Sequence, residues 1–459
     1  MRKDAPHTPN RALKVPSGRL SRLARMGRMT TGIAGRSLFN AAKELGQGHR
    51  PDLRGSVLTP ANIKRLTEEL AHMRGAAMKM GQLLSMDTGE FLPPELSDIL
   101  ARLRDNAHFM PPQQLKQVLT AAWGPDWQRQ FARFDPRPIA AASIGQVHKA
   151  ALKDGQELAI KVQYPGVVDS IDSDIANVGA LIRLSGLLPK GFDLAPILAD
   201  AKMQLHEETD YVLEAGHLRA FQSKLGGDPA FSLPQVIPEL SSKNTLAMTF
   251  MPGHPVEEAA SLDQDTRNGI ARDLIDLLLR EVFVFGLVQS DPNFANYRFD
   301  PATGKIILLD FGATRAVDPE LAGQYADILQ SGLAHDWTAL EQAARAIGLI
   351  TGEEDPTHRA KILDMMQAVF LAITDAPTFD FADLTLSQDL QSQGMALAQS
   401  GYVPPPVPMD VLYLQRKFGG IFLLANRLGA AVPLAEMLHD ALAQMDPLDQ
   451  NGRQGARQS

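Results

Sequence analysis

The sequence places one lysine, two aspartates and one asparagine at spacings that suit chemistry on a charged substrate. Lys161 stands in the apolar run that begins at Leu158. Asn296 stands five residues after Asp291, and Asp310 stands nineteen residues after Asp291. A lysine ammonium can neutralise phosphate oxygens, whereas carboxylate and amide oxygens are hard ligands for Mg²⁺. The ordered set therefore predicts a site for ATP and Mg²⁺.

An alanine-rich segment precedes this lysine. Residues 140–147 follow the pattern G-x-G-x-x-G-x-V of the kinase phosphate-binding hairpin, with alanine at the first two glycine positions. A Cβ atom disfavours positive φ and blocks close approach of the backbone to phosphate, so this loop is expected to clamp a nucleotide differently. The nucleotide contacts predicted from the segment are Ala140, Ala141, Ala142, Ser143, Gly145 and Val147.

A lysine on a buried strand needs a carboxylate partner, and an acidic segment farther along offers several. Glu207, Asp210 and Glu214 fall at i, i+3 and i+7 of a helical stretch expected over residues 167–216. They are therefore expected on one face, with Glu208 about 100° away from it. A solvated acidic face is the alternative interpretation, but the strand lysine favours a functional one.

The segment around Asp291 departs from protein kinases in two ways. Its spacing to Asn296 matches D-x-x-x-x-N of the catalytic loop, and Asp310 opens the sequence D-F-G. However, Gln289 and Ser290 stand where H-R would precede the aspartate. No A-P-E follows, and a helix expected to begin near residues 318–319 leaves no room for an activation segment. Phosphorylation of proteins is therefore not expected.

The type of secondary structure expected around these residues changes from helix to strand and back to helix along the chain. Apolar residues spaced by four and three predict a helix through residues 66–84, on which Lys79 and Gln82 lie one turn apart. Helices dominate after Pro252, apart from two strands that flank Gly304. Further strands are expected at residues 145–151, 157–163 and 245–251.

This order predicts an α+β protein of the kinase-like type, with a small strand-rich lobe followed by a large helical lobe. The predicted parts are a basic arm at 1–54, a helical extension at 55–135, an N-lobe at 136–251 and a C-lobe at 252–459.

Composition narrows the class of protein. The 459 residues are 44% hydrophobic and 21% charged, which allows a large core, and none is cysteine. Disulfide scaffolds, thiolate metal sites and cysteine nucleophiles are thus excluded, and a reducing compartment is favoured. Charges interrupt every long apolar stretch, so a membrane-spanning helix is not expected. No apolar segment of a secretory signal follows the basic N-terminus.

Charge is distributed unevenly. Residues 1–54 hold twelve Lys/Arg and three Asp/Glu, a net charge of +9 that leaves −17 on the remainder. A basic arm on an acidic body argues against nucleic acid as the main partner and for an anionic membrane lipid surface met by the arm. A partly disordered basic tail is the alternative, because the arginines at 19, 22, 25 and 28 do not form a clean amphipathic stripe.

Together these segments resemble the UbiB family of atypical kinase-like proteins, most of all the branch of the coenzyme Q biosynthesis ATPases. The resemblance runs from Lys14 to the segment Arg416-Lys-Phe-Gly-Gly420. It implies a bilobal protein-kinase-like fold whose helical extension packs over the active site and suppresses protein kinase activity. The motifs that carry it are Lys79-Met-Gly-Gln82, residues 140–148, Glu208-Thr-Asp210, Asp291-Pro-Asn with Asn296, and Asp310-Phe-Gly-Ala-Thr-Arg315.

The resemblance implies a catalytic role for five residues. Lys161 would contact phosphate and pair with Glu214. Asn296 and Asp310 would hold Mg²⁺, and Asp291 would be the acid of the catalytic loop.

It also implies regulatory contacts. Lys79 and Gln82 belong to the motif of the helical extension, and Lys79 would meet the acidic motif formed by Glu208 and Asp210. The hinge beside adenine would run from Met248 to Met251, an assignment made by position alone.

The activity implied by the resemblance is Mg²⁺-dependent ATP hydrolysis, stimulated by membranes or lipid-like ligands, in support of ubiquinone biosynthesis. The implied partners are ATP and ADP, ubiquinone precursors or biosynthesis enzymes, with a homodimer left open. Two alternatives stand beside the ATPase. One is a nucleotide-binding pseudokinase that scaffolds a biosynthetic complex, and the other is a phosphotransferase acting on a small or lipid substrate.

Location follows from the N-terminal region. Only thirteen residues precede Lys14, and residues 29–39 are too few and too polar to span a bilayer. A bacterial cytoplasmic protein peripheral on the inner membrane is therefore expected, with the matrix face of a mitochondrion as the alternative.

Overall fold

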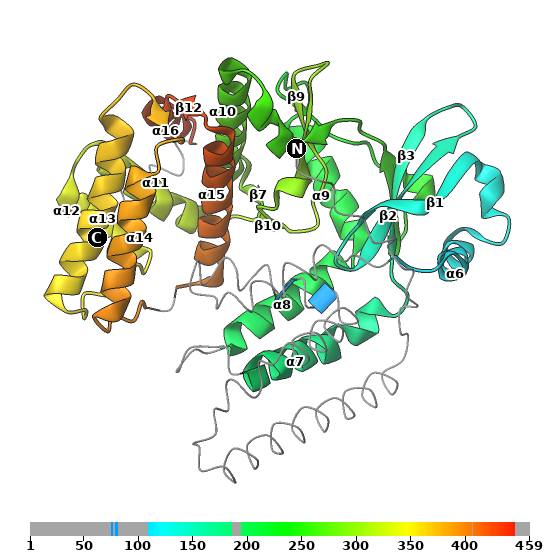
Figure 1. Cartoon of the computed structure of the whole chain (residues 1–459), viewed down its shortest axis with the longest axis horizontal. Coiled ribbons are helices and arrows are strands. Elements are labelled where there is room, and N and C mark those ends of the chain that lie inside the picture. The colour runs from blue at the N-terminus through cyan, green and yellow to red at the C-terminus, as the bar shows by residue number, and fades with distance from the viewer. Residues whose placement is uncertain (1–74, 77–78, 81–108, 186–193, 406, 446–459) are drawn as a thin grey trace, which may run out of the picture. The chain divides into compact units, whose positions relative to one another are not determined.

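The computed structural model describes residues 75–76, 79–80, 109–185, 194–405 and 407–445 (Figure 1). They form two compact units: the first ends at Arg219 but also takes in Pro234–Met251, and the second comprises Ala220–Leu233 and the chain from Pro252 onward. The mixture of helices and sheets confirms the α+β class. The predicted arm, most of the predicted helical extension and Gln82 lie outside the described residues.

The first unit is built on a four-stranded antiparallel sheet in the order β1-β2-β3-β5. Three strands confirm the sequence prediction, whereas β1 was not predicted. It contains Pro136 and Pro138, which weaken the strand signal and are tolerated because β1 is an edge strand with register shifts around them. The strands are Phe131–Ala141 (β1), Gly145–Leu152 (β2), Glu157–Gln163 (β3) and Thr245–Thr249 (β5).

Helix α6 (Pro112–Trp123) shares the core of this sheet. Leu115 and Leu119 are buried in one cluster with Leu158 and Ile160 of β3. The Trp123 indole donates a hydrogen bond of 3.1 Å to the carbonyl oxygen of Leu240. This buried cluster therefore includes residues that the sequence prediction placed in the helical extension.

A buried polar chain ties β2 to β1 and to the residues before α6. Gln146 Oε1 accepts the backbone N–H of Met110 at 2.9 Å, and its Nε2 lies 2.8 Å from His148 Nε2. His148 Nδ1 lies 2.9 Å from the Asp135 carbonyl oxygen, which can only accept. The proton is therefore on Nδ1, and the imidazole is neutral. Burial lowers the pKa of His148, although its bond to Asp135 opposes that shift.

Three helices replace the single stretch predicted over residues 167–216. The acidic face expected through Glu207, Asp210 and Glu214 is wrong, because the chain leaves the helix between the first two. Thr209 ends one helix, and the Asp210 carboxylate accepts two backbone N–H groups and caps the next. Threonine and aspartate favour such caps over helix interiors. The helices are Val167–Ser185 (α7), Ala195–Glu208 (α8) and Tyr211–Lys224 (α9).

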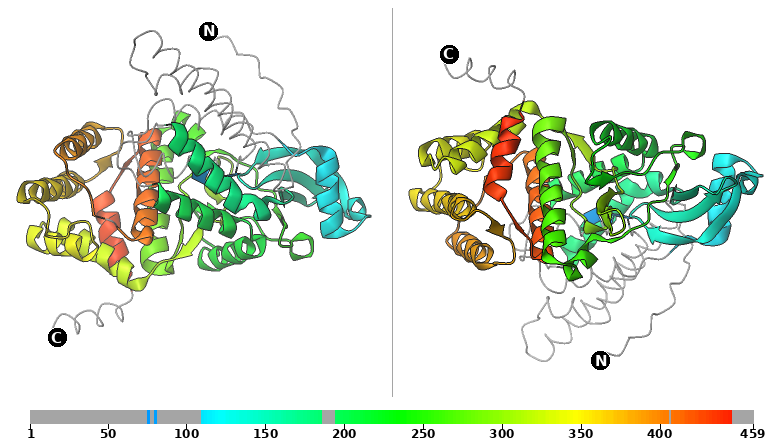
Figure 2. Two further views of the ribbon diagram at one scale, coloured as in Figure 1. Left: turned by 90° about the horizontal axis from the view of Figure 1, so that it is seen from below. Right: turned by 90° about the horizontal axis from the view of Figure 1, so that it is seen from above.

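The second unit is mainly helical, and α10 and α15 run side by side in it (Figures 1 and 2). A π-helical turn, Glu281–Phe285, follows α10. Among the described residues no helix combines the length and apolarity needed to cross a bilayer. The helices are Gln264–Arg280 (α10), Pro319–Leu333 (α11), Trp337–Ala346 (α12), Pro356–Thr374 (α13), Thr385–Gln399 (α14), Met409–Leu428 (α15) and Leu434–Ala443 (α16).

Short strands carry the motifs of this unit. The predicted pair around Gly304 is confirmed, and the φ of +69° at Gly304 suits a glycine turn. Helix α11 begins at Pro319, as predicted, with two residues between it and the end of β10, and Asp318 caps it. The strands are Phe231–Ser232 (β4), His254–Pro255 (β6), Leu287–Gln289 (β7), Tyr297–Asp300 (β8), Lys305–Leu308 (β9), Thr314–Ala316 (β10), Phe379–Asp380 (β11) and Ala431–Val432 (β12).

The buried imidazole predicts an acid-sensitive first unit. Because the folded pKa of His148 is lowered, the unfolded chain binds the proton first, and stability is lost as pH falls through the ordinary histidine pKa of about 6.5. His148→Asn, which can still donate to Asp135, should reduce this loss. The measurement is the thermal midpoint of both proteins between pH 8 and pH 5. Parallel pH profiles for the two proteins would contradict the assignment.

Candidate functional site

Lys161 lies in the middle of β3. This strand is central in the sheet, with β2 on one side and β5 on the other. Its ammonium forms an ion pair with the carboxylate of Glu214, in the first turn of α9. Both side chains are buried, at 10% and 6% exposure. Buried charges are tolerated only when paired, so this contact fixes α9 against the sheet. It is the pair that the resemblance implies, and it lies within the first unit.

The alanine-rich turn joins β1 to β2. The backbone N–H of Ala142 donates to the carbonyl oxygen of Gly145 at 2.9 Å. A Cβ atom on Gly145 would lie 2.4 Å from the carbonyl oxygen of Val162 and 3.0 Å from the Tyr211 hydroxyl. The third glycine of the pattern is therefore required by the close approach of β3 and α9, whatever it contributes to phosphate binding. The remaining predicted contacts of the segment lie on β1, the turn or β2: Ala140, Ala141, Ser143 and Val147.

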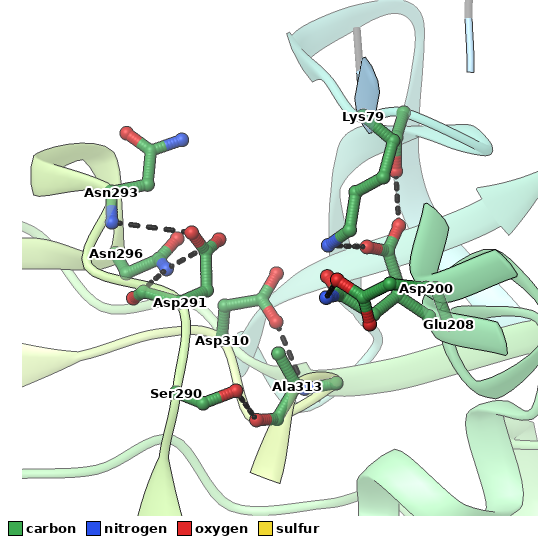
Figure 3. Close-up of polar contacts among 12 residues, drawn as sticks. Lys79, Asp200, Glu208, Ser290, Asp291, Asn293, Asn296, Asp310 and Ala313 are labelled. Carbon is green, nitrogen blue, oxygen red and sulfur yellow. Dashed lines mark hydrogen bonds and ion pairs between the residues drawn. The ribbon is translucent and has the colours of Figure 1, made fainter. Parts of the chain in front are cut away.

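Lys79 lies against this turn (Figure 3). Its ammonium is 2.7 Å from Glu208 Oε1, and the Ser143 hydroxyl donates to the other carboxylate oxygen. A Cβ atom on Gly75, one turn before Lys79, would be 2.8 Å from the Ser143 carbonyl oxygen. The last residue of α8 therefore joins the lysine of the extension to the alanine-rich turn. Asp210, grouped with Glu208 by the resemblance, caps α9.

Sequence reasoning assigned no role to Gly75 and no partner to Ser143. A glycine within an otherwise helix-forming segment was the available signal for close packing of the extension. Nothing in the sequence indicated what would approach it.

The Asp291 loop is held by its own side chains (Figure 3). Asn296 Nδ2 donates to Asp291 Oδ2 at 3.1 Å and to the Asp291 carbonyl oxygen at 3.3 Å. The backbone N–H of Asn293 donates to Asp291 Oδ1 at 3.3 Å. The hydroxyl and the backbone N–H of Ser290 both donate to the carbonyl oxygen of Ala313. The loop is thereby tied to the residues that follow D-F-G.

Asp310 follows a residue that is hydrogen-bonded to the end of this loop, within the second unit. The N–H of Leu309 donates to the Asn296 carbonyl oxygen at 3.1 Å, and Asp310 Oδ1 accepts from Gly312 N at 2.9 Å. Phe311 is buried against Phe221 of α9, with ring centroids 5.0 Å apart. The two aspartates and the asparagine therefore belong to segments bonded to each other.

The donor set of these three residues suits Mg²⁺ carried by a nucleotide. In the described part of the chain, no three His, Cys, Asp or Glu side chains form a group that could hold a metal alone. Mg²⁺ commonly uses one or two carboxylates and takes its other ligands from water and substrate phosphates. Because Asn296 Nδ2 is turned to Asp291, its Oδ1 is the atom that remains for a metal.

The predicted hinge residues lie in and just after β5, an edge strand of the sheet. Met248 is buried in β5, opposite Ala159 of β3. Met251 is the last residue of the first unit, and the chain enters the second unit at Pro252.

These features define a protein-kinase-like fold: a small antiparallel sheet with a central lysine paired to a helix glutamate, and a helical unit with an Asp/Asn loop and D-F-G. A solved structure of Rv3197 from Mycobacterium tuberculosis, in complex with erythromycin, shares this fold. Its TM-score is 0.55 at 21% sequence identity, over 90% of this chain and 97% of that one.

Residues 102–344 match the ABC1 atypical kinase-like domain. The chain is 37% identical to the atypical kinase COQ8, mitochondrial, of Saccharomyces cerevisiae, over 94% of this chain and 86% of that protein. It is 35% identical to the atypical kinase COQ8B, mitochondrial, of Rattus norvegicus, over 94% and 82%. The chain therefore belongs to the ABC1 family of atypical kinases, the UbiB family that its motifs predict.

The packing of Gly145 predicts a stability defect that needs no nucleotide. Gly145→Ala should lower the free energy of unfolding of the first unit by about 1–3 kcal/mol, because the methyl group meets the backbone of β3. Gly216→Ala is the matched control, since a Cβ there meets nothing within 4 Å and alanine suits the helix α9. Thermal melts without nucleotide check both. An unchanged midpoint for Gly145→Ala would leave phosphate approach as the reason for the glycine.

Proposed function

We propose that this protein is a Mg²⁺-dependent ATPase that supports coenzyme Q biosynthesis at a membrane and does not phosphorylate proteins. One observation carries the proposal: the second unit keeps Asp291, Asn296 and Asp310, yet only six residues separate Gly312 from the start of α11 at Pro319. Protein substrates of kinases lie on a longer activation segment. A site with nucleotide ligands and no such segment favours water as the phosphoryl acceptor.

Each residue then has a defined task. Lys161, oriented by Glu214, neutralises phosphate oxygens of the nucleotide. Asn296 and Asp310 would hold Mg²⁺, which would offset the charge that develops on the transferred group. Asp291, with its carboxylate held by Asn293 and Asn296, orients the attacking water and accepts its proton as the terminal phosphoanhydride bond breaks.

The contact of Lys79 with Glu208 and Ser143 supports a regulatory role for the extension. It links the extension to the turn that corresponds to the phosphate-binding hairpin of kinases. In this proposal the extension restricts the site to ATP and a small acceptor. The names of the yeast and rat relatives, atypical kinases COQ8 and COQ8B, support a function in coenzyme Q biosynthesis.

Purified protein should release phosphate from ATP only with Mg²⁺. Asp310→Asn should lower this turnover about a hundredfold or more, because the variant loses a charged metal ligand. Asp300→Asn, at the end of β8 where the side chain accepts hydrogen bonds from Ala302 and Thr303 of the following turn, is the control and should leave turnover unchanged. Tight nucleotide binding without phosphate release would instead favour the scaffold, and a phosphorylated small molecule would favour the phosphotransferase.

We further propose that the basic arm attaches the protein to an anionic membrane surface. The relatives named above are mitochondrial proteins. A bacterial inner membrane and the matrix face of a mitochondrion both offer anionic phospholipid, which basic segments bind.

Removal of residues 1–54, with a net charge of +9, should weaken binding to cardiolipin-containing liposomes and abolish its dependence on salt. Co-sedimentation at low and high salt measures this, with neutral liposomes as the control. Binding of the truncated protein equal to that of the full chain would place the membrane contact elsewhere.

A further inference from the structure

Helix α15 holds both ends of the Asp291 loop through one buried lysine. Lys417 is 1% exposed, and its ammonium lies 2.7 Å from the Tyr297 hydroxyl and 3.3 Å from Gln289 Oε1. Gln289 is the last residue of β7, just before the loop, and Tyr297 is the first residue of β8, just after it. A single ammonium therefore spans the loop that carries the predicted catalytic acid and one metal ligand.

The same helix touches the loop itself at Gly420. A Cβ atom there would lie 2.2 Å from Pro292 Cβ and 3.1 Å from Pro292 Cγ, so only glycine admits the proline at this distance. Pro292 directly follows Asp291. By contrast, a Cβ on Gly419 would meet nothing within 4 Å. Close approach is thus confined to the side of α15 that faces the loop.

A third contact on this side reaches the residues after D-F-G. The Arg315 guanidinium of β10 lies 4.2 Å from the ring centroid of Tyr413. Tyr413, Lys417 and Gly420 stand at i, i+4 and i+7, so they share one face of α15. That face contacts β7, the loop, β8 and β10, which are the segments that flank the three predicted Mg²⁺ and catalytic residues.

The cluster around Lys417 is built from directional polar contacts. Glu281 Oε2, on the π-helical turn after α10, lies 3.5 Å from the ammonium, and both side chains are 1% exposed. Burial raises the pKa of Glu281 to about 7, and Lys417 opposes this shift. A buried ammonium is costly unless it is fully hydrogen-bonded. Apolar contacts would suffice to dock a helix, whereas these bonds also set where the loop ends lie.

We propose that Lys417 and Gly420 are positioning residues that hold the Asp291–Asn296 loop in the geometry required for turnover of the Mg²⁺ nucleotide. The inference rests on the proposed ATPase function. It assigns a task to the segment Arg416–Gly420, where the resemblance to the family ends and which contributes none of the predicted catalytic or metal-binding residues.

The test compares Gly420→Ala with Gly419→Ala, adjacent substitutions of the same type in one helix. Gly420→Ala should lower kcat about tenfold to a hundredfold, because displacement of a reacting group by about 1 Å costs that much. It should reduce the gain in ADP affinity on adding Mg²⁺, since Asn296 moves with the loop. ADP affinity in EDTA should stay within about twofold of wild type. Gly419→Ala should match wild type in all three.

A second-site variant separates positioning from folding. Pro292→Gly removes the atoms that the new methyl group meets, so Gly420→Ala should cost little more in that background. Lys417→Met keeps the unbranched shape of the side chain, one atom shorter and without the donors, and should reproduce the kcat and Mg²⁺ effects.

The outcomes are distinguishable. Normal kcat and normal Mg²⁺ dependence in folded Gly420→Ala and Lys417→Met would overturn the inference. The inference would also be overturned if thermal melts showed both variants to be unfolded, because the contacts would then contribute to stability alone. If wild-type protein releases no phosphate, the ATPase proposal fails, and the Mg²⁺-dependent gain in ADP affinity still decides the inference.

Discussion

A buried lysine ammonium must be hydrogen-bonded, and this constraint organises both units. Lys79, Lys161 and Lys417 are 3%, 8% and 1% exposed, respectively. Each joins segments that are distant in sequence: the extension to the end of α8, β3 to α9, and α15 to both ends of the Asp291 loop. Because a buried charge without partners costs several kcal/mol, these pairings also exclude alternative packings of the same elements.

Glycines mark the places where these segments come closest. A Cβ atom would lie within 3 Å of another segment at Gly75, Gly145 and Gly420. Each contact lies near a buried lysine or its partner: Gly75 beside the Ser143 turn, Gly145 against β3, and Gly420 against the proline after Asp291. The lysines supply directional bonds, and the glycines allow the backbone distance at which those bonds form.

The motifs are therefore more than lists of catalytic groups. In the segment 140–148, Gln146 and His148 connect β2 to β1 and to the chain before α6, although the pattern alone suggested a phosphate-binding turn. In Glu208-Thr-Asp210, one carboxylate meets Lys79 while the other caps α9. Within one motif, therefore, some residues belong to the predicted site and others hold the strands and helices that position it.

The sequence by itself determined the fold class, the family and most elements that carry polar motifs, because spacing along a strand or a short loop is a local property. Strands β2, β3, β8 and β9 and the start of a helix near residues 318–319 follow from periodicity and turn residues. Strand β1 was missed, since its two prolines weaken the local signal.

Only the tertiary structure decided where helices break within the motifs and which buried contacts form outside them. The helix break at Thr209 depends on whether the polar side chains of Thr209 and Asp210 are more stable as helix caps or inside a continuous helix. The packing of the surrounding elements decides between the two. For Lys161 the residue pattern required a carboxylate partner, the family resemblance singled out Glu214, and the structure has that ion pair. The sequence could not indicate that Lys417 contacts Gln289 and Tyr297, which lie 128 and 120 residues before it in the chain. Such bonds join segments that periodicity cannot relate, and they exist only where folding excludes water from both partners.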